Sequence, residues 1–277
     1  MDEINNNLKL TNLKKYIIMK NSLLTLSLLM SFVSFGQTAI YSSNGVLTIE
    51  TPVVKDVLLG YPTADVLDSR AIDNYNKGTE ILQNLNKALN KTKEKDLIIQ
   101  AIDYFIISIN FDSKFVQAYD NIGKAYRMLK KYDLAIISYE MSLKIFPKGI
   151  SAHQNLAIVY DKQKNWDKAI KEYKTLITIS PKNPEGYYGL ANIYKKTSKL
   201  KLALFNAFIA LDLYRKEPTN YIGDSYGQIG LIYYYMGNKL KAKEYIQIAK
   251  EKHLSNNLES YFNSTFPDSM IKELSIN

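Results

Sequence analysis

The sequence predicts an all-α chain in which antiparallel helix pairs stack one after another into a solenoid. The 277 residues are rich in Leu, Ile, Tyr, Ala and Lys but include only 12 glycines and 7 prolines. This balance favours helices over turn-rich β architecture. The stretch "LKKYDLAIISY" at 129–139 returns as "QKNWDKAIKEY" at 163–173, which is 34 residues later. A repeat of this length is typical of helix pairs that bury their apolar faces against their neighbours.

An apolar segment near the N-terminus resembles a secretory signal peptide. Met19 and Lys20 precede the apolar run 23–35, and small residues at its end suit cleavage before Gln37. A helix over this run would extend about 20 Å, well short of the roughly 30 Å hydrocarbon core, so a retained anchor is the less favoured alternative. We expect residues 1–36 to be a signal peptide whose true start is Met19. The remaining chain is then exported, either periplasmic or secreted.

The next segment, residues 37–70, differs in composition from the rest of the chain. Asn44 and Gly45 stand between two apolar runs, which is the usual signal for a tight hairpin. A loose linker is the alternative.

Equivalent residues in successive repeats define a first helix, a turn and a second helix. In the first helix a small residue follows a large apolar one and lets another helix come close. These small residues are Gly123, Ala157, Ala191 and Gly230. The turn residues are Lys130, Lys164, Ser198 and Gly237. The second helix presents Ala135, Ala169, Ala203 and Ala242, which we expect to face the small residues of the first helix.

Trp166 is the only tryptophan of the chain. It stands in register with Tyr132 and Leu200, at the start of a second helix, where a large side chain packs under the preceding hairpin. We interpret Trp166 as a packing residue and not as a ligand site. On this interpretation, Trp166→Ala costs a core-type amount, about 3–5 kcal/mol.

Together, these equivalent positions resemble the tetratricopeptide repeat. The resemblance is clearest over residues 116–183 and extends to 256. The resemblance implies a right-handed superhelical solenoid with repeats at 116–149 and 150–183. Two less regular units follow at 184–217 and 223–256. The first of them has Arg215 in place of the proline that Pro147 and Pro181 supply earlier, and the second has Lys239 at the usual aromatic position and Leu254 at the proline position. A degenerate first repeat is expected at 71–115, and a capping helix, with Phe262, Phe266 and Ile271 as its apolar residues, at 257–277.

Few residues suit catalysis or metal binding. The chain has no cysteine, which excludes disulfides, thiolate metal sites, a cysteine nucleophile and a lipid anchor through cysteine. His153 and His253 are too far apart in sequence for a local metal motif, and no phosphate-binding glycine motif is present. "GDSYG" at 223–227 fits a nucleophile elbow around Ser225, but that elbow needs a preceding strand. We therefore expect no enzyme activity, no catalytic residue, no metal and no cofactor.

The resemblance also implies a concave groove, lined by the first helices, that accepts a peptide segment. The groove positions transferred by register are Asp120, Lys124, Arg127, Gln154, Asn155, Asp161, Tyr188, Asn192, Lys195 and Tyr234. The two-carboxylate clamp of chaperone-binding members is not transferred, because Asp120 and Glu185 stand near the places where that clamp needs cations.

The expected function is a non-catalytic protein–protein interaction scaffold of a bacterial-type cell envelope, with no membrane span after signal cleavage. The alternative uses the net charge of +9: a basic surface module that binds anionic glycan or membrane headgroups through Lys124, Arg127, Lys195 and Lys196. Nucleic acid is a less suitable partner, because an exported protein meets little of it.

Overall fold

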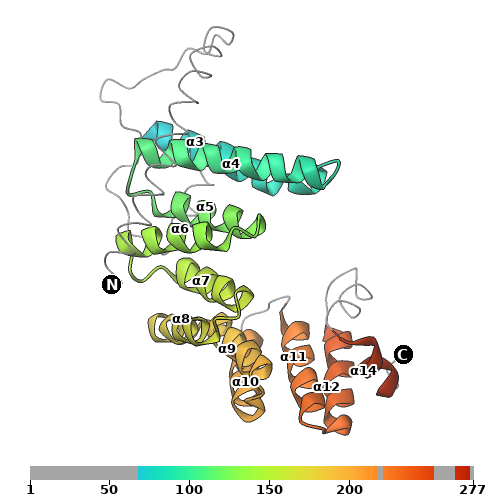
Figure 1. Ribbon diagram of the computed structural model, residues 1–277. Coiled ribbons are helices and arrows are strands. Elements are labelled where there is room, and N and C mark those ends of the chain that lie inside the picture. The colour runs from blue at the N-terminus through green and yellow to red at the C-terminus, as the bar shows by residue number, and fades with distance from the viewer. Residues whose placement is uncertain (1–67, 217–220, 253–265, 275–277) are drawn as a thin grey trace. The chain divides into compact units, whose positions relative to one another are not determined.

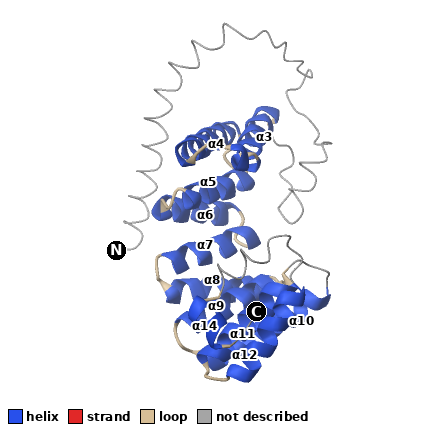
Figure 2. Ribbon diagram, turned by 90° about the vertical axis from the view of Figure 1, so that its right-hand side faces the viewer, coloured by secondary structure: helices blue, strands red, loops and turns tan. Residues whose placement is uncertain are grey.

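The computed structural model describes residues 68–216, 221–252 and 266–274. Over these ranges the chain forms eleven α-helices and one short 3-10 helix, and Figure 2 shows only helices and loops there. The prediction of an all-α chain of paired helices is confirmed for these residues. The predicted signal peptide (1–36) and almost all of the predicted linker or hairpin (37–70) lie outside the described residues.

The chain divides into two compact units, residues 1–152 and residues 153–277. The first contains four long helices, shown in blue to green in Figure 1. They are α3 (Ser69–Gln83), α4 (Lys91–Phe111), α5 (Val116–Met128) and α6 (Tyr132–Ile145), with the 3-10 helix η1 (Leu85–Lys87) between the first two. Each long helix packs on the next in sequence. The first pair is longer than the second, since α3 and α4 have 15 and 21 residues while α5 and α6 have 13 and 14.

The second unit continues the pattern from α7, whose first turn still belongs to the first unit. Its helices are α7 (Ile150–Lys162), α8 (Trp166–Ile179), α9 (Pro184–Lys196), α10 (Leu200–Lys216), α11 (Ile222–Tyr235), α12 (Lys239–Lys252) and α14 (Asp268–Glu273). From α8 to α12, each helix packs on the next (Figure 1). Asn183 caps α9 by accepting a hydrogen bond from the backbone N–H of Glu185, and Pro184 occupies the first turn, where its missing N–H costs nothing.

Packing within a helix pair differs in one detail from the sequence-based expectation. The four alanines of the second helices are completely buried. Gly230 lies against the backbone of Ala242, as expected, but the side chains nearest to Gly123 and Gly230 belong to larger residues one turn further along the second helix. A Cβ atom added to Gly123 would lie 2.6 Å from the ring of Tyr139, and one added to Gly230 would lie 2.6 Å from Ile246. The small residue therefore makes room for a bulky partner.

The turn between the two helices of a repeat has the same backbone conformation in four repeats. Lys130, Lys164 and Ser198 have φ of 57°, 58° and 58°, and Gly237 has φ of 80°. These are the four residues that the repeat register placed in the turn. Three of them are therefore side-chain-bearing residues in the left-handed region, which glycine tolerates best.

The positions of the prolines determine where several second helices end. The helices α6 and α8 have 14 residues each and end two residues before Pro147 and Pro181. Without a proline at position 215, α10 continues to 17 residues. Near the C-terminus Phe266, Met270 and Leu274 are buried. Met270 thus takes the inward position that was expected for Ile271, while Phe262 lies outside the described residues.

Candidate functional site

The predicted site residues on α5 belong to the first unit, and two of them take part in internal packing. Asp120 is buried, Arg127 is half-buried and Lys124 is exposed. Burial raises the pKa of the Tyr139 hydroxyl. The nearby Arg127 opposes this rise, and the nearby Asp120 adds to it. Arg127 therefore sits next to a buried tyrosine, and Lys124 is the α5 cation that faces solvent.

In the second unit Glu185 links three helices. Its Oε2 accepts a hydrogen bond from Nε2 of Gln154 on α7 at 3.1 Å. Its Oε1 accepts one from the hydroxyl of Tyr214 on α10 at 2.6 Å. Neither Glu185 nor Tyr214 was among the predicted site residues. Tyr214 lies in the last turn of α10, close to the point where the repeat pattern expects a proline, so the register gave no signal for it.

Tyr188 packs edge-on against Tyr214, with ring centroids 6.3 Å apart. Burial raises the pKa of the Tyr188 hydroxyl to about 12, and the carboxylates of Asp224 and Glu185 add to this rise. Asn192, one turn further along α9, lies beside the hydroxyl and favours its ionised form. On α11, Gln228 donates a hydrogen bond from Nε2 to the backbone oxygen of Tyr188 at 3.0 Å. The predicted residues Tyr188 and Asn192 are therefore together on a face that α11 holds in place.

The two lysines at the end of α9 have different surroundings. Lys196 forms an ion pair with Asp161 on α7, at 2.5 Å between Nζ and Oδ2. Burial lowers the pKa of Lys195 to about 8, and the neighbouring charge of Lys196 contributes to that decrease. Among the described residues no carboxylate forms an ion pair with Lys195. Lys195 thus remains the cation on this part of α9 without an acidic partner.

Tyr234, the predicted site residue on α11, contacts the C-terminal helix. Its hydroxyl donates a hydrogen bond to Oε2 of Glu273 on α14 at 2.6 Å. Glu273 also forms an ion pair with Lys239, and these two contacts lower the pKa of its carboxyl group, Lys239 more than Tyr234. The helix α14 therefore contacts the α11 position that was predicted to line the groove. Gln154 and Asn155, the remaining predicted residues, are half-buried on α7.

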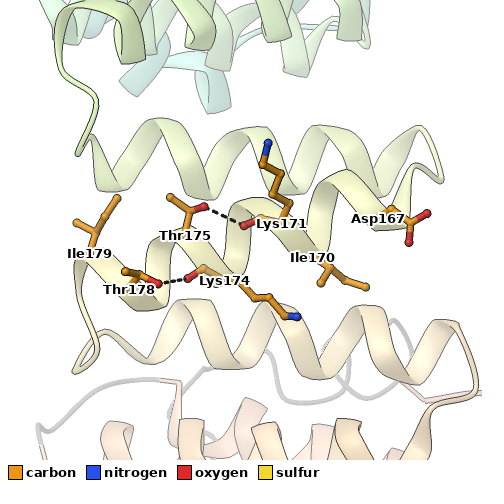
Figure 3. A pocket seen from close by; sticks show the side chains of 7 residues that line it. All are labelled: Asp167, Ile170, Lys171, Lys174, Thr175, Thr178 and Ile179. Carbon is orange, nitrogen blue, oxygen red and sulfur yellow. Dashed lines mark hydrogen bonds between the residues drawn. The ribbon is translucent and has the colours of Figure 1, made fainter.

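Two surface pockets have linings that include none of the predicted site residues. One of about 510 Å³ is formed by residues of α8 (Figure 3), and its lining residues are Asp167, Ile170, Lys171, Lys174, Thr175, Thr178 and Ile179. The hydroxyls of Thr175 and Thr178 donate to backbone oxygens of their own helix at 3.0 Å, as the dashed lines in Figure 3 show. Another, of about 390 Å³, lies on α3 and α4.

The residues considered for catalysis or metal binding have structural contacts. Ser225 is fully buried within α11, and its hydroxyl donates to the backbone oxygen of Tyr221 at 3.0 Å. The described residues around it are helical, and among them there is no preceding strand of the kind that a nucleophile elbow needs. Nδ1 of the buried His153 lies 2.7 Å from Oε2 of Glu172 on α8, and His253 lies outside the described residues. Within the described ranges no cluster of three or more His, Cys, Asp or Glu suits a metal ion.

None of the helices in the described part of the chain is both long and apolar enough to cross a bilayer.

Comparison with known proteins agrees with this fold. A family model described as TPR repeat matches residues 159–198, and one described as tetratricopeptide repeat matches residues 116–148 and 223–249. No curated protein matches the sequence.

Solved structures of repeat proteins superpose on much of the chain. MamA 41-end from Desulfovibrio magneticus RS-1 is 18% identical, with a TM-score of 0.54 over 68% of this chain and 97% of that protein. A second MamA structure is 17% identical, with a TM-score of 0.52 over 70% and 94%. TTC0263, a thermophilic TPR protein of Thermus thermophilus, is 14% identical, with a TM-score of 0.54 over 70% and 98%. The chain therefore contains tetratricopeptide repeats and shares the fold of solved tetratricopeptide-repeat proteins.

Proposed function

We propose that the protein is a non-catalytic protein–protein interaction scaffold that binds a peptide segment of a partner along its first helices. The observation that supports this most directly is the composition of one face of α9. Tyr188, Asn192 and Lys195 are spaced four and three residues apart, so they share one helical face. They offer an aromatic ring, an amide and a cation without an acidic partner.

The chemistry of this α9 face favours a partner segment with a carboxylate. An amine whose pKa burial lowers to about 8 gains most from a nearby negative charge, since that charge stabilises the ammonium form. The ring of Tyr188 packs on Tyr214, and its backbone oxygen accepts a hydrogen bond from Gln228, so this residue is ordered before a partner arrives. A preorganised face loses less conformational entropy on binding.

Site-specific crosslinking tests this proposal. A photoreactive residue at Asn192, in the full chain expressed in its own cells, should form a covalent adduct with a specific protein, and Lys195→Glu should abolish it. The matched control places the same residue at Lys171, which is exposed on α8. Equal crosslinking at both positions, or an adduct at Asn192 that Lys195→Glu leaves unchanged, would contradict the proposed binding face.

We also propose that this scaffold works in the cell envelope, after removal of residues 1–36. Support for export comes from the sequence alone. The mature protein should be recovered from the periplasmic or secreted fraction, and N-terminal sequencing should read from Gln37. Recovery from the cytoplasm with residue 19 still present would contradict export.

The alternative function, anionic glycan or headgroup binding through Lys124, Arg127, Lys195 and Lys196, has less support at those positions. Lys196 is engaged by Asp161, and Arg127 lies beside the buried Tyr139. A cation that already has an internal partner adds less to the binding of a polyanion.

A further inference from the structure

The helix α10 has an exposed apolar stripe that the proposed scaffold function does not use. Leu202, Phe205 and Phe208 are spaced three residues apart and are 48%, 64% and 36% exposed. Residues three apart lie on one side of an α-helix. The opposite side of α10, with Ala203, Ala207 and Ala210, is fully buried against its neighbours. We call these three exposed residues the α10 stripe.

The repeat fold does not need apolar residues at these positions. The register of the second helices aligns Ala203 with Ala169 on α8 and with Ala242 on α12. At the stripe positions α8 has exposed Lys168, Lys171 and Lys174, and α12 has exposed Lys241, Glu244 and Gln247. Both neighbouring second helices therefore fold with polar residues where α10 presents Leu and Phe. Packing within the unit does not explain the α10 stripe.

At one end of the stripe, Phe208 packs on an aromatic cluster that has two cations near it. The Phe208 ring meets the Tyr245 ring of α12 edge-on, with centroids 6.0 Å apart. Burial, followed by the neighbouring Tyr233 and Glu244, raises the pKa of the Tyr245 hydroxyl, and Arg215 lies close enough to oppose that rise. Tyr245 also packs on Tyr233, whose ring lies 5.2 Å from the ammonium of Lys241. Apolar, aromatic and basic groups therefore lie near the point where Phe208 of α10 meets Tyr245 of α12.

Acidic groups near the stripe are few. Asp212, one turn beyond Phe208, is neutralised by an ion pair with Lys216 at 2.6 Å. Glu244 is exposed on α12, beside Lys241 and Lys243. At the other end of α10, Lys199 and Lys201 are exposed. The charge around the stripe is therefore net positive, in keeping with the net charge of +9 for the whole chain.

We propose that the α10 stripe docks the protein onto an anionic phospholipid bilayer surface, with Leu202, Phe205 and Phe208 in the headgroup region and the surrounding Lys and Arg side chains on the lipid phosphates. Helices that lie in a membrane interface combine exposed Phe and Leu with flanking lysines in this way. A second copy of the chain is a poorer occupant, because it brings the same positive rim. Phe205 is 64% exposed, and a protruding aromatic ring suits insertion among lipid headgroups.

Vesicle co-sedimentation of the full chain tests this proposal. Vesicles of phosphatidylcholine with about one third phosphatidylglycerol are compared with vesicles of phosphatidylcholine alone. We expect at least about tenfold tighter binding to the anionic vesicles, since each lysine near an anionic surface contributes roughly fivefold. The apolar segment 23–35 is the same in all variants, so any binding that it causes cancels in the comparison between them.

Three variants separate the stripe from general charge effects. Phe205→Glu introduces the residue that α12 has at the equivalent position, so we expect the helix to tolerate the substitution. This variant should bind anionic vesicles about tenfold more weakly, or weaker still. Phe205→Leu keeps an apolar side chain and should bind within about twofold of the original. Gln100→Glu makes the same charge change at an exposed position of α4 and should also stay within about twofold. Circular dichroism verifies that each variant is folded.

Three outcomes would overturn the proposal. The first is equal binding of the full chain to both kinds of vesicle. The second is equal binding of Phe205→Glu and Gln100→Glu to the anionic vesicles. The third is a dimer in sedimentation velocity that Phe205→Glu dissociates, because the stripe would then join two copies. None of these outcomes depends on crosslinking at Asn192. The proposed scaffold function and the proposed membrane docking are therefore tested separately, and either can fail without the other.

Discussion

The hydroxyl of Tyr214 donates a hydrogen bond to the carboxylate of Glu185 at 2.6 Å, and that same carboxylate accepts a second hydrogen bond from Gln154. These contacts join the second helix of one repeat to the first helices of two repeats, α9 and α7. Burial, followed by the hydrogen bond to Glu185, raises the pKa of the Tyr214 hydroxyl. The hydroxyl therefore stays protonated and remains a donor.

Tyr214→Phe should lower the free energy of unfolding by about 1.5–3 kcal/mol, because a hydrogen bond to a charged group in a partly buried site is lost. Urea unfolding followed by circular dichroism measures the change. Tyr221→Phe is the matched control, since Tyr221 is exposed and packs on Tyr214 through its ring, and it should cost less than about 0.5 kcal/mol. A double mutant with Glu185→Gln should show coupling with Tyr214→Phe. Additive effects would mean that the contact contributes little.

Lys195 should make stability depend on pH. Its pKa of about 8 in the folded protein is below the ordinary value of 10.5, so between these values the unfolded chain binds more protons and the free energy of unfolding rises with pH. Below about pH 8 the amine is charged in both states, and the full cost of burying that charge is present. Lys195→Met should therefore be more stable than the original chain at pH 7, by on the order of 1–3 kcal/mol.

The advantage of Lys195→Met should shrink as the pH rises from about 8 toward 10, where the native amine becomes neutral. Thermal unfolding of both proteins at pH 7, 8.5 and 9.5 measures this trend. Lys171→Met, at an exposed site on α8, serves as the control and should show a difference that does not change with pH. A constant difference for Lys195→Met would mean that Lys195 is well solvated.

Replacing a left-handed turn residue by glycine should stabilise the repeats. Lys164 has φ of 58°, a conformation that costs a residue with a Cβ roughly 1–2 kcal/mol. Lys164→Gly should therefore raise the free energy of unfolding by up to about 1 kcal/mol, after the greater freedom of glycine in the unfolded chain is subtracted. Gly237→Ala is the reverse substitution, at φ of 80°, and should destabilise by a similar amount. Chemical denaturation distinguishes these opposite signs.

The repeat register predicted much of the fold because residues at equivalent positions of successive repeats have the same physical role. The four alanines of the second helices are fully buried, and the four turn residues named from the sequence have positive φ. The missing proline at Arg215 signalled an irregular unit, and α10 is longer there. Local spacing and turn chemistry are sufficient for these features.

The candidate site was less predictable, because a register gives the side of a helix and not the partners of a side chain. Asp120 and Arg127 were assigned to a solvent-facing groove, yet Asp120 is buried and both lie near Tyr139. Tyr234 was assigned to the same groove, but it bonds to Glu273, which is 39 residues away in sequence. Lys195 and Lys196 look alike in the sequence, and only the three-dimensional contact with Asp161 distinguishes them.

Trp166 illustrates the same limit and leads to a revised prediction. The register places it at the start of α8, which is correct, but its side chain is only partly buried. Partial burial removes less apolar surface from water than full burial does, so Trp166→Ala should cost about 1–2 kcal/mol, below the core-type range expected from sequence. Leu176→Ala, on the same helix and fully buried, should cost about 2–5 kcal/mol. Urea unfolding of both variants gives the comparison, and a larger loss for Trp166→Ala than for Leu176→Ala would restore the core interpretation.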